Sequence, residues 1–438
     1  MKLLQVSKAD VLGGAERIAW LLFQGCRDRG HDSWLAVDEK HSGDPGVLKI
    51  PPRPWARIAR PVLHPERYPA GTKGRLLRVY GSNPGAFRRA LLGQDSFAFP
   101  GSRRLMTLPP QPPELLHFHN LHSSYFDLRA LRRYRVPLVV TMHDAWLLTG
   151  GCTHPLDCRR YLEGCGECPY RHLHFRAAIV DSTAFNHRRK RRALAGARIH
   201  LVTPCHWLMD KVAGTLLEPA LASRQVIPNG VDTSIFRPGD GALARAALNV
   251  SPETRIILHA SATPTRNVSK DFSTMREAVI RMARAAPKMQ LLFLVVGESA
   301  ADEQLSPHAR VRFLPFTEKP EEMAQHYAAA DMYLQASLAD TFPNTILEAM
   351  ACGVIPLATA VGGIPEQIID QQTGRLFAPG PDLAERLAVG MVLLLQNDAK
   401  RRAMGTAALH HVRAHFSLDR QIDAHLALYE RLLGEGRR

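Results

Sequence analysis

Two acidic residues flank a predicted helix start in the stretch SLADTFPNTILEAMACG, which spans residues 337–353. Pro343 favours a helix start, because its missing N–H costs nothing in the first turn, and Gly353 favours a helix end. Asp340 then lies in the loop before the helix and Glu348 lies within it, so both can face one ligand. Carboxylates accept hydrogen bonds from hydroxyls, which favours a sugar or a ribose. The alternative is an aspartate that stabilises the helix dipole and an exposed glutamate.

Two cations lie in the loop ASATPTRNVSKDF, which follows a predicted strand at residues 255–262. Arg266 and Lys270 at the carboxyl end of a strand are suited to binding a diphosphate. A nucleoside diphosphate that leaves during a reaction gains negative charge in the transition state, so fixed cations there lower the barrier. The alternative is that both side chains face solvent.

Glycines and histidines follow other predicted strands. Gly13 and Gly14 follow the first strand, where they would let backbone N–H groups approach a phosphate. A plain tight turn is the alternative. His143 follows a buried strand, as His119 does, and it could hydrogen-bond a sugar hydroxyl or stabilise developing charge. Equally, this turn could only form a helix cap that begins at Asp144.

Four cysteines crowd into the loop at residues 150–172, with five, six and two residues between successive cysteines. Thiols at such density are typical of a tetrahedral zinc site, although the first spacing is wider than in a standard zinc ribbon. Disulfides are disfavoured in a reducing cytoplasm. We predict a structural zinc site, with four free thiols as the alternative, at Cys152, Cys158, Cys165 and Cys168.

The elements that must position these residues form two series of alternating apolar strands and helices. This order predicts an α/β fold with two Rossmann-like domains that face each other across a cleft. In such sheets, ligands bind beyond the carboxyl ends of the strands, where most of the residues named above fall. We predict an N-terminal domain at 1–225, with an irregular basic insertion at 51–113, a C-terminal domain at 226–415 and a final helix at 416–438.

The composition is that of a globular protein, with 45% hydrophobic and 22% charged residues among 438. The sequence contains no apolar run long enough to span a membrane and no signal-peptide core, so we expect a cytoplasmic protein. Its net charge of +15 favours anionic partners. A basic nucleic-acid-binding protein with a cysteine module is the alternative to an enzyme. The aromatic content of 7% and the lack of a basic-aromatic motif count against it.

From its first strand to about residue 415, the chain resembles the retaining glycosyltransferases of family 4, which have the GT-B fold. Two acidic residues with seven residues between them, followed by EAMACG and GGIPE, are a specific signature. The stretches VVTMHDAW and VIPNGVDTSIFRP occur in the expected order before it. The stretch HDAWLLTGGCTHPLDCRRYLEGCGECP further resembles a bacterial branch linked to the assembly of cell-surface polysaccharides.

The resemblance implies a role for each candidate residue. Gly13 and Gly14 would lie near the donor diphosphate, and His143 would contact the donor sugar near its reacting carbon. Asp340 matches a position where the family usually has glutamate, and Asp271 replaces a common glycine. The remaining donor contacts would be Arg266 and Lys270 on the diphosphate, Glu348 on the ribose, and Thr341, Phe342, Pro343 and Asn344 beside the transferred sugar.

The resemblance also implies a hexosyltransferase-type reaction that retains the anomeric configuration and requires no metal cofactor. The acceptor hydroxyl would attack from the side on which the diphosphate leaves, so no protein nucleophile would be needed. The donor would be a UDP- or GDP-linked sugar. The acceptor would be a glycan or a polyprenyl-diphosphate-linked glycan, and the enzyme would lie in the cytoplasm, peripherally on the inner face of the membrane. A C-terminal helix would return to the N-terminal domain.

Overall fold

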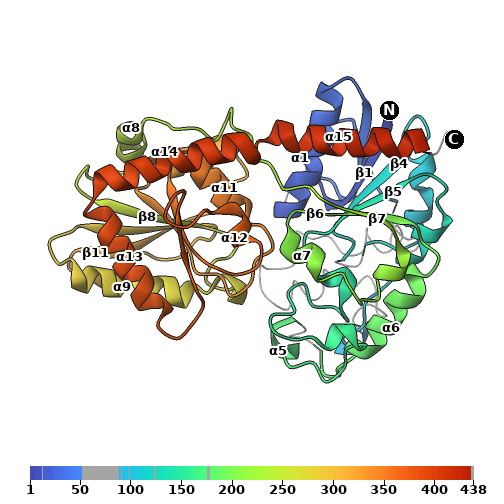
Figure 1. The fold of residues 1–438 in the computed structure, drawn as a ribbon, viewed down its shortest axis with the longest axis horizontal. Helices are drawn as coiled ribbons and strands as arrows, with labels where there is room; N and C mark the ends of the chain where they lie inside the picture. The colour runs from blue at the N-terminus through green and yellow to red at the C-terminus, as the bar shows by residue number, and fades with distance from the viewer. Residues whose placement is uncertain are drawn as a thin grey trace, which may run out of the picture. The chain divides into compact units, whose positions relative to one another are not determined.

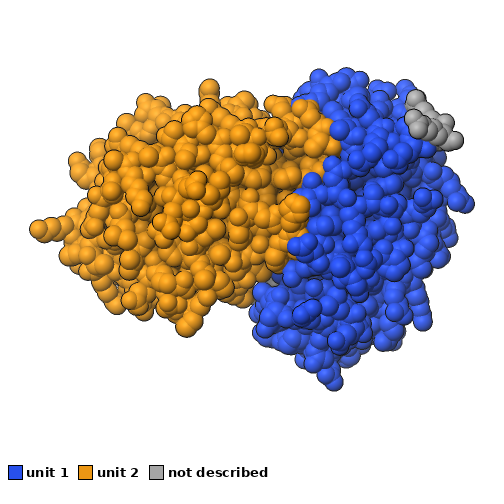
Figure 2. Space-filling view, in the orientation of Figure 1, with its two compact units in different colours: residues 1–203, 208–226, 426–438 blue, residues 204–207, 227–425 orange. Residues whose placement is uncertain are grey.

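The chain forms two compact units in the computed structural model (Figures 1 and 2). Unit 1 comprises residues 1–203, 208–226 and 426–438, and unit 2 comprises residues 204–207 and 227–425. Residues 52–87, within the predicted basic insertion, lie outside the described part of the chain. The structure describes residues 1–11, 13–51, 88–89, 91–97, 99–122, 125–174 and 178–435.

Unit 1 is built on a parallel sheet of seven strands in the order β3-β2-β1-β4-β5-β6-β7. The sequence predicted five of these strands with their order along the chain. The short β3 and the half-exposed β7 were not predicted. The strands are β1 Lys2–Ala9, β2 Asp32–Glu39, β3 Val47–Lys49, β4 Leu115–His119, β5 Leu138–Thr141, β6 Ile199–Thr203 and β7 Leu221–Val226.

Helix α1, Gly14–Asp28, packs against the sheet of unit 1 through apolar residues at helical spacing, which include Ala19 and Phe23. Short helices connect the other strands. They are α5 Arg171–His174, α6 Thr183–Leu194 and α7 His206–Asp210, with 3₁₀ helices η3 Pro100–Thr107, η4 Leu128–Arg133, η5 Trp146–Leu148, η6 Arg160–Leu162 and η7 Glu218–Ala220.

Unit 2 contains a second sheet of seven strands in the order β10-β11-β9-β8-β12-β13-β14, with only β10 antiparallel to its neighbour. Both units therefore have the Rossmann-like α/β arrangement that the sequence predicted. The strands are β8 Arg255–Ala260, β9 Leu291–Val296, β10 Glu303–Ser306, β11 Ala309–Leu314, β12 Met332–Gln335, β13 Ile355–Thr359 and β14 Arg375–Phe377.

Helices α9 and α13 pack together over one face of this second sheet and bury the main apolar core of unit 2 (Figure 1). Successive side chains of a strand point to opposite faces, so Tyr333 and Gln335 of β12 point away from this core. The helices of unit 2 are α8 Gly241–Ala247, α9 Phe272–Ala285, α10 Pro320–Ala329, α11 Asn344–Ala351, α12 Ile364–Gln367, α13 Leu383–Leu395 and α14 Asp398–His415, with η8 Val268–Lys270.

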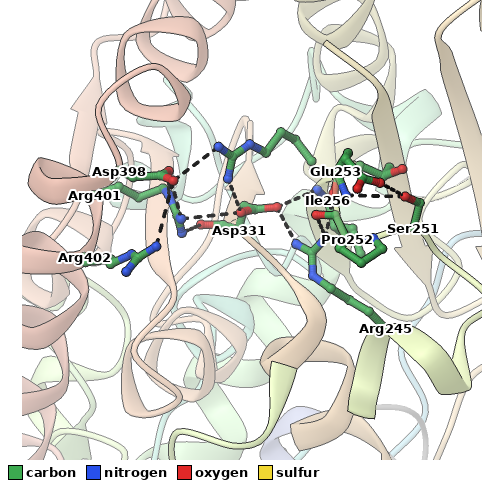
Figure 3. Close-up of polar contacts among 11 residues, drawn as sticks. Arg245, Ser251, Pro252, Glu253, Ile256, Asp331, Asp398, Arg401 and Arg402 are labelled. Atoms are coloured by element: carbon green, nitrogen blue, oxygen red, sulfur yellow. Dashed lines mark hydrogen bonds and ion pairs between the residues drawn. The ribbon is translucent and has the colours of Figure 1, made fainter. Parts of the chain in front are cut away.

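Asp331 anchors a charge network at the amino end of β12 (Figure 3). Its side chain is only 5% exposed and accepts from Arg245 at 2.6 Å and Arg255 at 3.2 Å. Arg401 from α14 lies 3.5 Å away and also pairs with Asp398. The network joins four segments at the end of the sheet opposite to the predicted ligand loops, so we assign it a structural role.

Helix α15, Leu418–Glu435, begins among residues of unit 2 and ends among residues of unit 1. Its last part packs on the sheet of unit 1, where Tyr429 is fully buried. The predicted return of the C-terminal helix to the N-terminal domain is thus confirmed. None of the helices in the described residues combines the length and apolar character that crossing a bilayer requires.

Candidate functional site

The acidic pair lies around helix α11, as the sequence predicted. Pro343 is the N-cap residue with φ −66°, and the helix begins at Asn344. Gly353 follows the helix with φ +74°, a left-handed conformation that favours glycine. Asp340 lies in the loop between β12 and α11, and Glu348 lies in the second turn of the helix.

Lys270 and Asp340 form an ion pair at the carboxyl ends of β8 and β12. The Lys270 Nζ atom lies 2.5 Å from Asp340 Oδ2, and the two side chains are 18% and 15% exposed. The backbone N–H of Leu338 donates to Ser269 O at 2.9 Å, which fixes the two loops to each other. A partly buried ammonium group is therefore held at the sheet edge where ligands of such folds bind.

Gln335, the last residue of β12, holds the carboxylate of this pair. Its Nε2 atom donates to Asp340 Oδ2 at 3.0 Å. Its Oε1 atom accepts from the hydroxyl of the buried Tyr333 at 2.9 Å, which fixes the orientation of the amide. The sequence interpretation missed Gln335, although a polar residue at the carboxyl end of a buried strand was a signal for it.

Glu348 is oriented by a buried tyrosine from the neighbouring helix α10. The Tyr327 hydroxyl donates to Glu348 Oε2 at 2.9 Å. Burial, and then the nearby Glu348 charge, raise the pKa of Tyr327 well above its usual range, so the hydroxyl keeps its proton. Tyr327 therefore acts as a permanent donor that fixes one oxygen of a half-buried carboxylate. Tyr327 was also missed from the sequence.

The cation loop has a defined conformation despite the unusual Asp271. This residue adopts φ +46°, the left-handed region that glycine favours, and its side chain accepts from Thr274 N at 3.3 Å to cap α9. Asn267 Oδ1 accepts from Ser269 N at 3.1 Å. The side chain of Arg266 is exposed in the same loop. Asp271 thus replaces the family glycine by combining a left-handed backbone with a helix cap.

The backbone between Asp340 and α11 is tightly packed. The Thr341 carbonyl accepts from Gly363 N at 3.0 Å, and a Cβ atom on Gly363 would lie 2.2 Å from that oxygen. This close approach explains the second glycine of the GGIPE stretch. The Thr341 side chain is only 4% exposed, and its hydroxyl has no hydrogen-bond partner among the described residues.

The residues that follow Thr341 in this loop are also fixed by contacts within unit 2. The Pro343 carbonyl accepts from Gln367 Nε2 at 3.0 Å, and Asn344 Oδ1 accepts from Asn229 Nδ2 at 3.0 Å. The ring of Phe342 lies edge-on to that of Phe416. These contacts therefore hold the loop from Thr341 to Asn344 in a fixed conformation.

The remaining candidates belong to unit 1. Gly13 has φ +98° and is the N-cap of α1, and a Cβ atom there would lie 2.4 Å from Glu16 Oε2. Gly14 begins the helix and has open space around its Cα. His143 lies two residues beyond β5 and is half-buried, with its Nε2 atom 3.1 Å from His119 Nδ1.

Asp144 makes a side-chain contact in the turn after His143, although the N-cap residue of η5 is Ala145. Asp144 Oδ1 accepts from Trp146 N at 2.8 Å at the start of η5. Asp144 Oδ2 lies 3.0 Å from His122 Nε2, which forms an ion pair when the imidazole is protonated. The Asp144 side chain thus holds the turn before η5, while His143 makes a separate contact with His119.

The cysteine loop gives no support to the predicted zinc site. Among the described residues, no three or more His, Cys, Asp or Glu side chains are arranged to hold a metal ion. All four cysteines have free thiols. Burial raises the pKa of Cys152 to about 12 and that of Cys165 to about 11, so both thiols stay protonated at neutral pH. The alternative of four free thiols fits the described structure.

Comparisons with known proteins agree with this architecture. A D-inositol 3-phosphate glycosyltransferase of Segniliparus rotundus is 33% identical over 225 residues, which cover 48% of this chain and 47% of that protein. The chain thus spans about half the length of the curated relatives it matches. Two similar solved structures are sucrose-phosphate synthase from Thermosynechococcus elongatus (TM-score 0.64, 18% identity, 99% of both chains) and Anabaena HepE with UDP-glucose (TM-score 0.60, 16% identity, 98% and 99%).

These structural similarities confirm the predicted GT-B fold. The family model for Glycosyl transferases group 1 matches residues 254–397, which lie in unit 2. The model for Glycosyltransferase Family 4 matches residues 12–235, just over half of the chain. The chain belongs to glycosyltransferase family 4.

Proposed function

We propose that this protein is a retaining, metal-independent glycosyltransferase of hexosyltransferase type. It transfers a sugar from a UDP- or GDP-linked donor to a glycan or a polyprenyl-diphosphate-linked acceptor during cell-surface polysaccharide synthesis. The observation that carries the proposal is the Lys270–Asp340 ion pair at the carboxyl ends of β8 and β12. The family assignment favours a transferase over the nucleic-acid-binding alternative.

The donor diphosphate binds at the loops after β8 and β12. Lys270 and Arg266 supply two cations, and the first N–H groups of α11 supply the positive end of a helix dipole. The buried Thr341 hydroxyl, which has no partner among the described residues, is available to donate to a phosphate or sugar oxygen. These groups would neutralise the charge that develops on the leaving diphosphate without a metal ion.

The ribose of the nucleotide binds to Glu348. Tyr327 donates to Oε2 of this carboxylate, which fixes the side chain while it accepts from ribose hydroxyls. Asp340 lies one loop away, where it both holds Lys270 and can accept from a hydroxyl of the transferred sugar. The shorter aspartate at this family position is supported by Gln335, which holds the carboxylate at a fixed place.

Transfer proceeds on one face of the sugar. The acceptor hydroxyl forms the new bond to the anomeric carbon as the bond to the diphosphate oxygen breaks, and that oxygen takes the acceptor proton. No protein nucleophile takes part. Lys270 and Arg266 stabilise the departing diphosphate, and His143 contacts the sugar near its reacting carbon. Donor hydrolysis without acceptor should release the sugar with its original anomeric configuration, and chelators should leave the rate unchanged.

A thermal-shift screen with UDP-, GDP- and ADP-sugars tests the donor site. At about one hundred times Kd, a ligand adds about 2.7 kcal/mol, which is a rise of about 5 °C or more for a domain of this size. Lys270→Ala and Glu348→Ala should each abolish the shift. The exposed residues Lys288 and Glu321 provide matched controls, whose alanine variants should keep it. A full shift in either site variant would refute the donor assignment.

A basic surface on unit 1 supports attraction to an anionic membrane. Arg188, Arg191 and Arg192 of α6 are exposed. Just before this helix, Ile179 and Val180 are 71% and 46% exposed, which is unusual for such apolar side chains. Each cation near an anionic bilayer contributes about 1 kcal/mol at the surface. This charge fits an acceptor anchored at the inner face of the membrane.

Co-sedimentation with vesicles tests this surface. Arg188→Gln, Arg191→Gln and Arg192→Gln together should weaken low-salt binding to anionic vesicles by about 100-fold, from about 1 kcal/mol per charge. The control removes three exposed cations from unit 2 through Arg284→Gln, Lys288→Gln and Arg413→Gln, and it should bind as the wild type does. Equal loss in the two triple variants would show that only net charge matters.

A further inference from the structure

A buried chain of hydrogen bonds runs through unit 1 behind His143. Its members are Gln5 in β1, His117 and His119 in β4, and Tyr429 in α15, all with side chains fully excluded from solvent. Because His117 and His119 are two residues apart in a strand, they point to the same face of the sheet. Neither the sequence motifs nor the proposed reaction accounts for this polar group inside an apolar core, where every donor must meet an acceptor.

The tyrosine hydroxyl sets the direction of the chain at one end. Gln5 Nε2 donates to Tyr429 Oη at 3.4 Å. We assign the single hydroxyl proton to the contact with His117 Nδ1, 2.6 Å away, which makes this nitrogen an acceptor. His117 in its neutral form therefore carries its proton on Nε2, which donates to Thr141 Oγ1 at 2.7 Å.

The Gln5 amide also determines which atoms donate and which accept in the hydrogen bonds that lead to His143. With its amide nitrogen directed to Tyr429, Gln5 presents Oε1 to His119 Nε2 at 3.0 Å. An amide oxygen can only accept, so the neutral His119 ring has its proton on Nε2 and a lone pair on Nδ1. That lone pair lies 3.1 Å from His143 Nε2, which must then be the donor.

We propose that Gln5, His119 and Tyr429 are positioning residues that hold His143 in the tautomer with its proton on Nε2. The Nδ1 atom of the neutral His143 ring is then a hydrogen-bond acceptor. If His143 contacts the donor sugar, it receives a hydrogen bond from a sugar hydroxyl rather than giving one. This consequence for transfer rests on the proposed function, whereas the tautomer itself follows from the hydrogen-bond chain alone.

If the Gln5 amide alone turned over, its nitrogen would face the protonated Nε2 of His119, so the amide orientation and the tautomers of His119 and His143 must change together. Loss of the Tyr429 hydroxyl removes the acceptor that the Gln5 amide nitrogen has in this group of described residues. The amide can then turn its nitrogen toward His119, which would reverse both downstream bonds and move the His143 proton to Nδ1. The tautomer of a half-buried ring in unit 1 is thus set by a residue in the last helix.

Side-chain NMR of the full chain with ¹⁵N-labelled histidine tests the proposal at pH 8. Long-range ¹H–¹⁵N spectra distinguish protonated from unprotonated ring nitrogens, and His143→Gln assigns the signals. In the wild type, His119 and His143 should both be protonated on Nε2. A wild-type His143 protonated on Nδ1 would overturn the proposal without any variant.

The variant Tyr429→Phe should shift His143 to a mixture of tautomers or to the reversed one. The control is Tyr125→Phe, which removes another buried hydroxyl next to the chain, one that donates to the His119 backbone carbonyl at 3.2 Å. This control should leave the tautomer unchanged. An unchanged His143 tautomer in folded Tyr429→Phe would contradict the proposed control by α15.

Turnover then links the tautomer to the reaction. The kcat of Tyr429→Phe should fall by the fraction of His143 that has lost its Nε2 proton, while donor Kd stays the same because unit 2 holds the diphosphate. An unchanged kcat despite a reversed tautomer would refute the positioning role. If no nucleotide sugar supports turnover by the wild type, the proposed function fails, and the NMR result still decides the tautomer.

Discussion

The substitution Lys270→Met removes the ammonium group from the proposed diphosphate site and keeps most of the aliphatic stem. It has two separate consequences. Asp340 loses the cation 2.5 Å from its Oδ2, and the donor that remains on that atom among the described residues is the Gln335 amide. The donor diphosphate loses one of two cations. The loss of stability and the loss of donor binding differ in magnitude, and a second substitution should reverse only the loss of stability. The two effects can therefore be measured separately.

The stability cost follows from the exposure of the pair. Exposed ion pairs contribute about 0–1 kcal/mol, whereas removal of one partner from a fully buried pair costs about 3–5 kcal/mol. With side chains 18% and 15% exposed and one donor retained, Lys270→Met should cost about 1–2 kcal/mol. This corresponds to a fall in Tm of about 5 °C for a unit of this size.

The binding cost follows from the lost charge-assisted hydrogen bond. Such bonds contribute about 1.5–3 kcal/mol, so the Kd for the nucleoside diphosphate should rise by about 10- to 150-fold. The double variant Lys270→Met, Asp340→Asn removes the unpaired carboxylate as well. It should recover most of the lost Tm, while the weakened binding remains.

Differential scanning fluorimetry and isothermal titration calorimetry with UDP and GDP measure the two effects on the same samples. Lys288→Met, at an exposed position of the same unit, is the control and should change neither quantity. The reasoning is refuted if Lys270→Met binds nucleotide within twofold of the wild type. It is also refuted if the double variant recovers binding together with stability, because the defect would then be one of folding.

Three further predictions concern other parts of the chain. Glu348→Gln should weaken UDP binding by about 10-fold or more, because the variant loses an ionic acceptor for the ribose hydroxyls. The variant should bind 2′,3′-dideoxy-UDP as the wild type does. Equal losses of affinity for both ligands would exclude a ribose contact. Asp331→Asn should destabilise unit 2 in urea by about 3 kcal/mol because several arginines lose a buried partner, whereas Asp398→Asn, 39% exposed, should cost about 1 kcal/mol or less; similar costs would contradict the assigned network. Burial lowers the pKa of His122, but the hydrogen bond and the charge of Asp144 outweigh burial, and the pKa rises above 6.5. The stabilisation of the fold by this ion pair is therefore present below pH 6.5 and is lost as pH rises through the folded pKa. His122→Gln should therefore cost more stability at pH 5 than at pH 8.5, and equal costs would argue against the ion pair.

The local signals for strands, turns and caps predicted much of unit 2. The glycine stop at Gly353 and the proline start at Pro343 depend on backbone properties of single residues, so they can be recognised without tertiary information. Asp340 and Glu348 were found for the same reason, because each lies at a fixed distance from these markers. The ion pair between Asp340 and Lys270 could not be predicted, since the two residues are far apart in the chain.

Helices α13 and α14 were not predicted from the sequence, and each contains a glycine in its interior. Gly390 in α13 packs against the Phe377 ring, where a Cβ atom would lie 2.7 Å from the ring. Gly405 in α14 packs against the Gly353 carbonyl, where a Cβ atom would lie 2.3 Å away. Glycine is unfavourable within a helix, but here it allows close packing, and only the tertiary structure shows that reason.

The zinc prediction finds no support among the described residues, because residue spacing does not fix side-chain geometry. Four cysteines close in sequence met the compositional criterion, yet the described loop leaves their thiols unarranged for a metal ion. Contacts over long sequence separations were also beyond local patterns. Gln5 and Tyr429 are 424 residues apart and meet inside unit 1, so neither could be recognised as part of the hydrogen-bond chain that reaches His143.

A crystal structure of the chain with the nucleotide selected by the thermal-shift screen tests the central claim most directly. We expect diphosphate oxygens within hydrogen-bond distance of Lys270 Nζ and the Arg266 guanidinium, with the ribose hydroxyls on the Glu348 carboxylate. A nucleotide bound elsewhere on the chain, with the Lys270–Asp340 pair and Glu348 free of ligand, would contradict the account.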